Sequence, residues 1–140
     1  EFMPLDSARA WLRNLVVPGH EVLDHLRARF DLVPAPSDNL SATARCWAFA
    51  DGRGEIGIIA PITEPFCARC NRLRMTADGK LRTCLFSLVE HDLRSLLRNG
   101  TTDEAIVQWL KAEVWHKEPR HHIGEPEFTP PARSMARIGG

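Results

Sequence analysis

The chain has 140 residues, of which 44% are hydrophobic and 26% charged, a composition that indicates one ordinary globular domain and excludes a disordered or fibrous protein. Its 18 basic residues balance its 18 acidic residues, so no overall field draws it to nucleic acid or to an anionic membrane. It has no apolar run of about 18 residues and no signal-peptide pattern, so we expect a cytoplasmic protein with reduced cysteines.

Residues 1–34 are predicted to form one strand followed by one helix. Residues 1–5 are a short apolar run without an initiator methionine, and we interpret them as a strand cut out of something larger. Residues 19–30 carry apolar side chains at three- and four-residue intervals, which predicts a helix that Pro34 prevents from continuing. Together these elements indicate the last unit of a β/α series.

The next part of the chain is predicted to form a loop and then a hairpin. Residues 34–44 are rich in Pro, Ser, Asn and Asp, a composition typical of loops. Residues 45–50 and 54–60 are rich in strand formers and flank Asp51–Gly52, a dipeptide that tolerates the positive φ values of a tight turn. We therefore expect two antiparallel strands here.

A second hairpin is predicted around the turn residues Ala77–Asp78–Gly79, with strands at residues 72–76 and 80–85. Because side chains alternate along a strand, Arg72 and Arg74 are expected on the face that also carries Cys70. This pattern places two guanidinium groups beside a thiol.

Two helices are predicted after this hairpin, at residues 89–98 and 102–117, from the periodicity of their apolar residues. The residues expected to point inward are Val89, Leu93, Leu96 and Leu97 in the first helix and Ile106, Trp109, Leu110 and Val114 in the second. Asn99–Gly100 is a stop signal for the first helix, and Thr101 with Glu104 offers a capping box for the second. Several prolines follow residue 118, and they exclude regular structure near the end of the chain.

Three of the four cysteines, Cys67, Cys70 and Cys84, lie in one short stretch with five Arg or Lys residues between them. Two residues separate the first pair, so one tight turn can aim both sulfurs at one metal, and the second hairpin brings Cys84 back toward them. Spacing alone favours zinc, and a 4Fe–4S cluster with one open iron is the alternative. A fourth zinc ligand would come from Cys46, His91, His121 or His122.

Arg72 and Arg74 allow two interpretations. Charged residues that alternate along a strand usually form its solvated face. Arginine also has the planar fork that matches phosphate and carboxylate, and both residues lie beside the candidate metal site. The residues by themselves leave a solvated face and an anion site as alternatives.

The sequence around the cysteines resembles a known family. Residues 61–74 (PITEPFCARCNRLR) and 76–86 (TADGKLRTCLF) are similar to the C-terminal cluster segment of the GTP 3′,8-cyclases of molybdenum cofactor biosynthesis. The similarity continues into residues 122–126 and 133–135 and into the closing Gly139–Gly140, so it covers essentially the whole chain. Members of this family are radical S-adenosylmethionine lyases that convert GTP to 3′,8-cyclo-7,8-dihydro-GTP with a 5′-deoxyadenosyl radical, the first step of the pathway.

The resemblance implies an α/β fold, as a C-terminal fragment of an incomplete TIM-like radical S-adenosylmethionine barrel. Residues 1–34 would be the last strand and helix of the barrel. Residues 35–140 would be a C-terminal domain for a 4Fe–4S cluster and GTP, with two antiparallel hairpins that carry the cysteines, two helices and a diglycine tail.

The resemblance reverses the preference for zinc. Cys67, Cys70 and Cys84 match three ligands of a 4Fe–4S cluster whose open iron contacts the purine of GTP. A metal site built on these cysteines is therefore expected to hold iron and sulfide.

The resemblance also implies roles for residues outside the cysteine set. Arg72, Leu73 and Arg74 match the GTP-binding stretch of the family, and Met3 matches a methionine that lines the S-adenosylmethionine pocket. Gly139–Gly140 matches a tail that enters the active site and is needed for activity. Glycine suits such a tail, because a segment without side chains fits beside a substrate.

The chain departs from the family because it lacks the CxxxCxxC motif that binds the radical-generating cluster. We therefore expect it to be inactive alone, to need the missing N-terminal radical S-adenosylmethionine region as its partner, and to expose apolar faces that this region would cover. Whether it forms a homodimer is left open. The alternative function is a non-catalytic zinc-binding interaction module derived from the same family.

Overall fold

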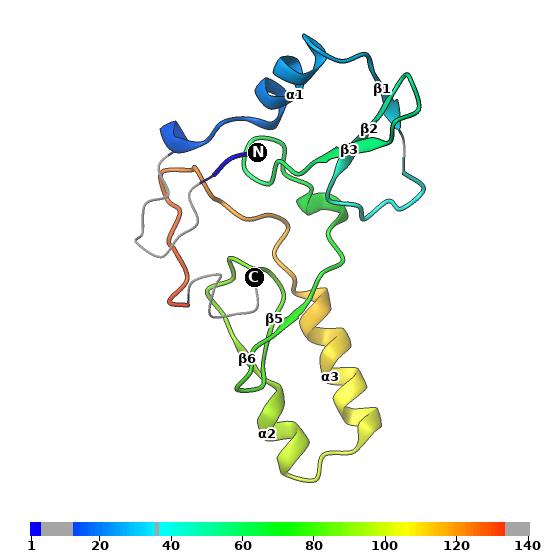
Figure 1. Ribbon diagram of the computed structural model, residues 1–140. Coiled ribbons are helices and arrows are strands. Elements are labelled where there is room, and N and C mark those ends of the chain that lie inside the picture. The colour runs from blue at the N-terminus through cyan, green and yellow to red at the C-terminus, as the bar shows by residue number, and fades with distance from the viewer. Residues whose placement is uncertain (4–12, 36, 134–140) are drawn as a thin grey trace. The chain divides into compact units, whose positions relative to one another are not determined.

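A computed structural model describes residues 1–3, 13–35 and 37–133 of the chain (Figure 1). These residues form two compact units, with the described residues up to Cys70 in the first and those from Asn71 onward in the second. Each unit combines helix with a small antiparallel sheet, so the expected α/β class is confirmed. The barrel and the domain boundary after residue 34 concern the longer family protein and stay predictions.

Helix α1 (Gly19–Arg27) in the first unit confirms the helix predicted there, although it ends before residue 30. Leu23 is its buried apolar residue, and Ala28 closes the helix by donating its N–H to the carbonyl of Asp24 at 3.0 Å. Phe30 then packs edge-on against Phe49, with the ring centroids 5.5 Å apart. This contact fixes the end of the helix segment against the sheet of the same unit.

The sheet of the first unit has the antiparallel order β1 (Leu32–Ala35), β2 (Arg45–Phe49), β3 (Glu55–Ile58). The predicted β2–β3 hairpin is confirmed, and its turn contains Gly52 at a φ of +77°. Strand β1 corrects the expectation that residues 34–44 form only a loop. Pro34 pairs with Trp47 at the edge of the sheet, where a residue without an N–H is tolerated.

Glu1 ties the N-terminal residues to the first unit. Its carboxylate accepts the N–H of Ile62 and the hydroxyl of Thr63, each at 2.6 Å. Phe2 forms a single antiparallel bridge with Val17. Of the strand predicted at positions 1–5, the described residues 1–3 contribute only this one bridge. Positions 4 and 5 lie outside the described residues.

The sheet of the second unit has the antiparallel order β4 (Arg74–Met75), β5 (Lys80–Arg82), β6 (His91–Asp92). The predicted β4–β5 hairpin is confirmed, with shorter strands than expected. Its turn requires Gly79, whose φ is +80°. A Cβ at this position would lie 2.6 Å from the Cβ of Arg94, so a side chain would also clash.

Helix α2 (Leu93–Arg98) follows β6 directly. The carboxylate of Asp92 caps it by accepting the N–H of Ser95 at 3.1 Å. The helix therefore begins at Leu93 and not at residue 89, because His91 and Asp92 pair with β5 instead. Its end at Asn99 is as predicted.

Helix α3 (Asp103–Trp115) begins one residue later than expected. Its cap is Thr102, whose hydroxyl accepts the N–H of Ala105 at 3.3 Å. Thr101 is not the cap, because its own N–H and hydroxyl bond to the side chain of Asn99. Among the described residues, no helix is long and apolar enough to cross a membrane.

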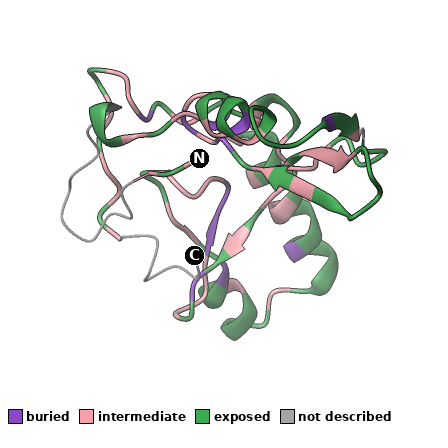
Figure 2. Ribbon diagram, turned by 45° about the horizontal axis from the view of Figure 1, so that its top comes forward, coloured by how far each residue is buried: buried purple, intermediate pink, exposed green. Residues whose placement is uncertain are grey.

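The second unit has a small apolar core. It consists of Leu81, Leu93 and Ile106, against which Leu96, Trp109 and Leu110 pack. Val89, Leu97 and Val114 were expected to point inward, but they are 56%, 57% and 42% exposed. Figure 2 accordingly shows short buried stretches in a chain that is mainly half-buried or exposed.

Candidate functional site

Cys67 and Cys70 lie on one tight turn at the end of the first unit. The turn is the 3-10 helix η2 (Cys67–Arg69), and the N–H of Cys70 donates to the carbonyl of Cys67 at 3.0 Å. Both thiols are half-buried. The predicted tight turn at the CxxC pair is confirmed, and it is the backbone arrangement through which such pairs bind metals.

Arg72 and Arg74 lie in the segment that enters β4 of the second unit. Both are half-buried, whereas Leu73 is 42% exposed and Met75 is 64% exposed. This is the reverse of an ordinary surface strand, in which the apolar residues lie inward and the arginines outward. Both arginines are therefore less exposed than the two apolar residues that alternate with them.

Cys84 lies just beyond β5, next to Thr83, which is 2% exposed. Its thiol is half-buried, and its carbonyl accepts the N–H of Ser87 at 3.2 Å. The β4–β5 register pairs Arg74 with Arg82, and continuing it by two residues would set Arg72 opposite Cys84, although the ladder itself ends at Arg74 and Arg82. The open end of this hairpin therefore carries both an arginine and a cysteine of the candidate site.

The three cysteines are divided between the two units, with Cys67 and Cys70 in the first and Cys84 in the second. In the part of the chain that the structure describes, no three His, Cys, Asp or Glu side chains form a group that could hold a metal ion. Two alternative ligands have acidic partners, because His91 and His122 each have a carboxylate oxygen 2.7 Å from Nδ1. The three-cysteine site stays a prediction.

Met3 is half-buried at the end of the first described stretch. Gly139 and Gly140 lie outside the described residues. The roles that the family resemblance implies for these three residues stay predictions.

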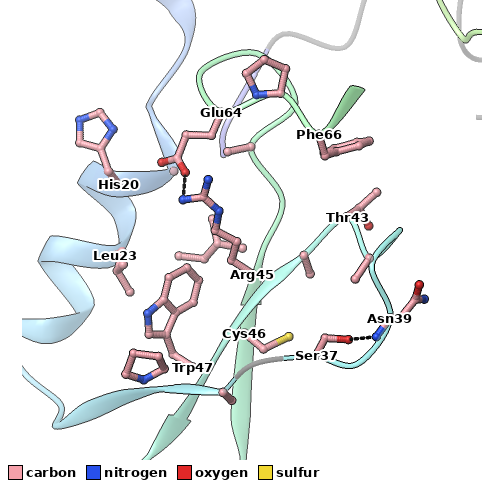
Figure 3. A pocket seen from close by; sticks show the side chains of 18 of the residues that line it. His20, Leu23, Ser37, Asn39, Thr43, Arg45, Cys46, Trp47, Glu64 and Phe66 are labelled. Atoms are coloured by element: carbon pink, nitrogen blue, oxygen red, sulfur yellow. Dashed lines mark hydrogen bonds and ion pairs between the residues drawn. The ribbon is translucent and has the colours of Figure 1, made fainter. Parts of the chain in front are cut away.

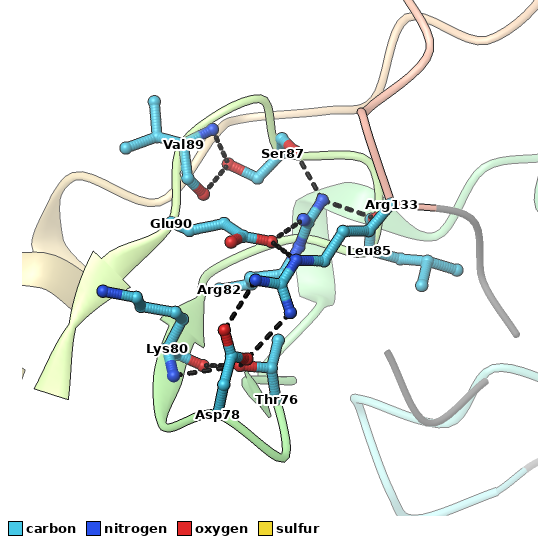
Figure 4. Close-up of polar contacts among 9 residues, drawn as sticks. All are labelled: Thr76, Asp78, Lys80, Arg82, Leu85, Ser87, Val89, Glu90 and Arg133. Carbon is cyan, nitrogen blue, oxygen red and sulfur yellow. Dashed lines mark hydrogen bonds and ion pairs between the residues drawn. The ribbon is translucent and has the colours of Figure 1, made fainter. Parts of the chain in front are cut away.

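Arg82 is a buried residue of the site region that the sequence did not single out. It is 2% exposed, and its Nη1 lies 2.6 Å from Oε1 of Glu90 (Figure 4). Its Nη2 donates to the carbonyls of Ser87 at 2.5 Å and Leu85 at 3.2 Å. The loop after Cys84 is therefore wrapped around one guanidinium, which fixes the path of the chain there.

Arg133 connects the end of the described chain to the same hairpin (Figure 4). It forms ion pairs with Asp78 in the β4–β5 turn and with Glu90, whose Oε1 lies 3.2 Å from its Nε. Hydrogen bonds from Arg133 and then from Thr76 hold the pKa of Asp78 well below its usual range. Alternation along a strand gives no signal for these contacts, since the partners are far apart in sequence.

Lys117 and Glu118 follow α3 and contact the open end of the hairpin. The ammonium of Lys117 donates to the carbonyls of Arg72, at 3.1 Å, and Thr83. The carboxylate of Glu118 accepts the hydroxyl of Thr83 at 2.6 Å. Burial raises the pKa of Glu118, but the hydrogen bonds from Ser87 and Thr83, a backbone hydrogen bond and the charge of Lys117 together hold that pKa below its usual value.

The first unit also contains a cleft of about 620 Å³ next to the CxxC turn (Figure 3). Its lining includes His20, Arg45, Cys46, Trp47, Glu64 and Phe66. Arg45 forms an ion pair with Glu64 across one side of it. Cys46, one of the candidate fourth ligands, lies half-buried in this lining.

Comparison with known proteins identifies relatives of the whole chain. Residues 1–123 match the family described as Molybdenum Cofactor Synthesis C. A protein of Mycobacterium sp. (strain KMS) named GTP 3′,8-cyclase is 45% identical over 140 residues. GTP 3′,8-cyclase 2 of Mycobacterium tuberculosis (strain ATCC 25618 / H37Rv) is 44% identical over 144 residues. All of this chain is covered in each match, but it spans 40% of the length of each relative.

Proposed function

The chain belongs to the Molybdenum Cofactor Synthesis C family, and we propose that it is the substrate-side, GTP-binding 4Fe–4S part of a GTP 3′,8-cyclase. The name of the relatives supports the activity, and the 40% coverage supports a role as one part of a longer enzyme. The chemistry and partial burial of the residues support the assignments below.

Cys67, Cys70 and Cys84 are proposed to bind one 4Fe–4S cluster. The donor set fits this group, because all three are half-buried thiols and each can serve one iron. A bound cluster of this type supplies one iron with an open position for a nitrogen or oxygen of the substrate.

Arg72 and Arg74 are proposed to bind GTP, with Leu73 linking them. The observation that carries the proposal is that both arginines are half-buried while the neighbouring apolar residues, Leu73 and Met75, are exposed. A partly desolvated guanidinium attracts a phosphate more strongly than one in bulk water. Continuing the β4–β5 register would bring Arg72 opposite Cys84, so a nucleotide bound by Arg72 would lie close to one proposed cluster ligand.

The remaining assignments concern the complete protein. Residues 1–34 are proposed to complete a radical S-adenosylmethionine barrel and residues 35–140 to form the cluster and GTP domain. Met3 is proposed to line the S-adenosylmethionine pocket, and Gly139–Gly140 to reach the active site. With an N-terminal region that contributes the CxxxCxxC cluster, the protein would convert GTP to 3′,8-cyclo-7,8-dihydro-GTP in the cytoplasm.

GTP binding to the anaerobically reconstituted chain tests the proposal. We expect the double substitution Arg72→Ala and Arg74→Ala to weaken GTP binding by at least about tenfold, because each charge-assisted contact is worth roughly 1.5–3 kcal/mol. Iron and sulfide content should not change. Arg98→Ala is the matched control, because this arginine is exposed on α2.

Two outcomes of this titration would overturn the proposal. One is a reconstituted parent chain that does not bind GTP at all. The other is a double variant that binds GTP as tightly as the parent and the Arg98→Ala control do.

A further inference from the structure

The β4–β5 hairpin stops pairing just before it reaches the candidate site. Its ladder consists of Arg74 with Arg82 and Met75 with Leu81. Continuing the same register would pair Leu73 with Thr83 and Arg72 with Cys84, but these residues lie outside both strands. The spacing between the segments around Arg72 and Cys84 is therefore not set by the β4–β5 hydrogen-bond ladder.

Lys117 bridges the two segments of the hairpin at this point. Its ammonium donates to the carbonyl of Arg72 on one segment, at 3.1 Å, and to the carbonyl of Thr83 on the other segment. An ammonium has three N–H donors, so one side chain can bond both carbonyls at once. Lys117 is half-buried, and Thr83 is 2% exposed, so water competes little for these bonds.

The bridge is itself held in place by the end of α3. The N–H of Lys117 donates to the carbonyl of Val114 at 3.1 Å, which fixes its main chain to the last turn of the helix. The next residue, Glu118, accepts the hydroxyl of Thr83 at 2.6 Å. Two consecutive residues therefore hold the segment that leads into Cys84, and one of them also holds the segment that carries Arg72.

We propose that Lys117 is a positioning residue for the nucleotide site, which sets the spacing between the main chains that carry Arg72 and Cys84. This inference rests on the proposed function, because the spacing matters only if Arg72 and Arg74 bind GTP next to a cluster that includes Cys84. Lys117 does not contact the nucleotide in this account. It keeps the arginines at a fixed distance from the cysteine, so that a nucleotide bound by the arginines meets the metal centre in one geometry.

The first test measures nucleotide binding and its effect on the cluster. We expect Lys117→Met to weaken GTP binding to the reconstituted chain by about tenfold, since two charge-assisted hydrogen bonds to the hairpin are lost. The change that GTP causes in the electron paramagnetic resonance spectrum of the reduced cluster should also disappear. Lys117→Arg should restore both, because a guanidinium can donate to two carbonyls. Lys111→Met is the control, since Lys111 is exposed on α3.

The second test does not need GTP or the cluster. Amide hydrogen exchange of the unreconstituted chain should become faster at residues 72–73 and 83–85 in Lys117→Met and stay unchanged at the turn around Gly79. If the parent chain does not bind GTP, the proposed function fails and hydrogen exchange still decides whether Lys117 holds the hairpin. Exchange that is unchanged in Lys117→Met would overturn the inference. If the parent chain binds GTP, a Lys117→Met variant with the same GTP affinity and the same GTP-induced spectral change would also overturn it.

Discussion

Arg133 and Asp78, 55 residues apart in the sequence, form a bidentate ion pair. Nη1 and Nη2 of Arg133 lie 2.7 Å and 2.6 Å from the two carboxylate oxygens of Asp78. This geometry favours the charged carboxylate and so lowers the pKa of Asp78. The pair connects the last described residue to the turn of the hairpin that carries Arg72, Arg74 and Cys84. It therefore holds Arg133 at the turn of this hairpin.

Acid should weaken the second unit through this pair. Because the pKa of Asp78 is lower in the folded chain than in the unfolded chain, its contribution is fully present above about pH 4 and is lost as the pH falls toward the folded value. Asp92 acts with the same sign, since Lys80 and Ser95 lower its pKa to about 2. Thermal unfolding between pH 6 and pH 2 should show a falling melting temperature below about pH 4.

The variant Asp78→Asn should reduce that pH dependence, because it removes one of the shifted groups. Asp38→Asn is the control, since Asp38 is exposed in a loop of the first unit. An Asp78→Asn chain whose melting temperature falls with acid as steeply as that of the parent would contradict this account.

Removal of the charge of Glu90 should destabilise the second unit strongly. Glu90→Gln leaves the guanidinium of Arg82, which is 2% exposed, without its charged partner. Because Glu90 is itself 22% exposed, we expect a loss of about 2–3 kcal/mol in the free energy of unfolding, below the range for a fully buried pair. Urea unfolding measures this loss. Glu127→Gln, a change at an exposed position, should cost less than about 0.5 kcal/mol, and equal losses in the two variants would be the contrary result.

Two glycine turns allow a matched comparison of backbone strain and steric clash. Gly52 and Gly79 have φ values of +77° and +80°, but a Cβ at Gly52 would meet no atom within 4 Å, whereas a Cβ at Gly79 would lie 2.6 Å from the Cβ of Arg94. Gly52→Ala should therefore cost about 1–2 kcal/mol for the left-handed backbone alone. Gly79→Ala should cost about 1–3 kcal/mol more, because the clash adds to the strain. Urea unfolding of the two variants checks the difference, and equal costs would show that the turn relaxes freely.

The elements that could be predicted from the sequence depend on local signals. Helix α1 was predicted from its apolar intervals, and the β2–β3 and β4–β5 hairpins from the turn residues around Gly52 and Gly79. Asn99 was correctly identified as the end of α2. In each case the residues that determine the structure are close neighbours in the chain.

The elements that were missed depend on distant partners. Strand β1 contains Pro34 and forms because β2 offers an edge, which composition cannot show. The capping residue of α3 was misplaced by one position, since Asn99 engages Thr101 and leaves Thr102 to cap the helix. The burial of Arg82 could not be predicted, because charge alternation along a strand is the same for a buried and an exposed arginine.

In the candidate site, the sequence predicted the CxxC turn and the hairpin that leads into Cys84. It did not predict the residues that hold this arrangement, Lys117, Glu118 and Arg133. Lysine and glutamate after a helix are common surface residues, so only their contacts reveal that they bond to a hairpin formed by residues more than 30 positions away. The candidate ligands could therefore be named from the sequence, whereas the residues that hold the hairpin in place could be identified only from their contacts in the structure.

Metal and sulfide analysis of single cysteine variants tests the central claim most directly. After anaerobic reconstitution, the parent chain and Cys46→Ala should each contain about four irons and four sulfides per chain, the content of one 4Fe–4S cluster. Cys67→Ala, Cys70→Ala and Cys84→Ala should each lose most of that iron and sulfide. A single zinc in the parent chain, or a Cys84→Ala chain that keeps its full iron and sulfide content, would contradict the claim that these three cysteines hold one cluster.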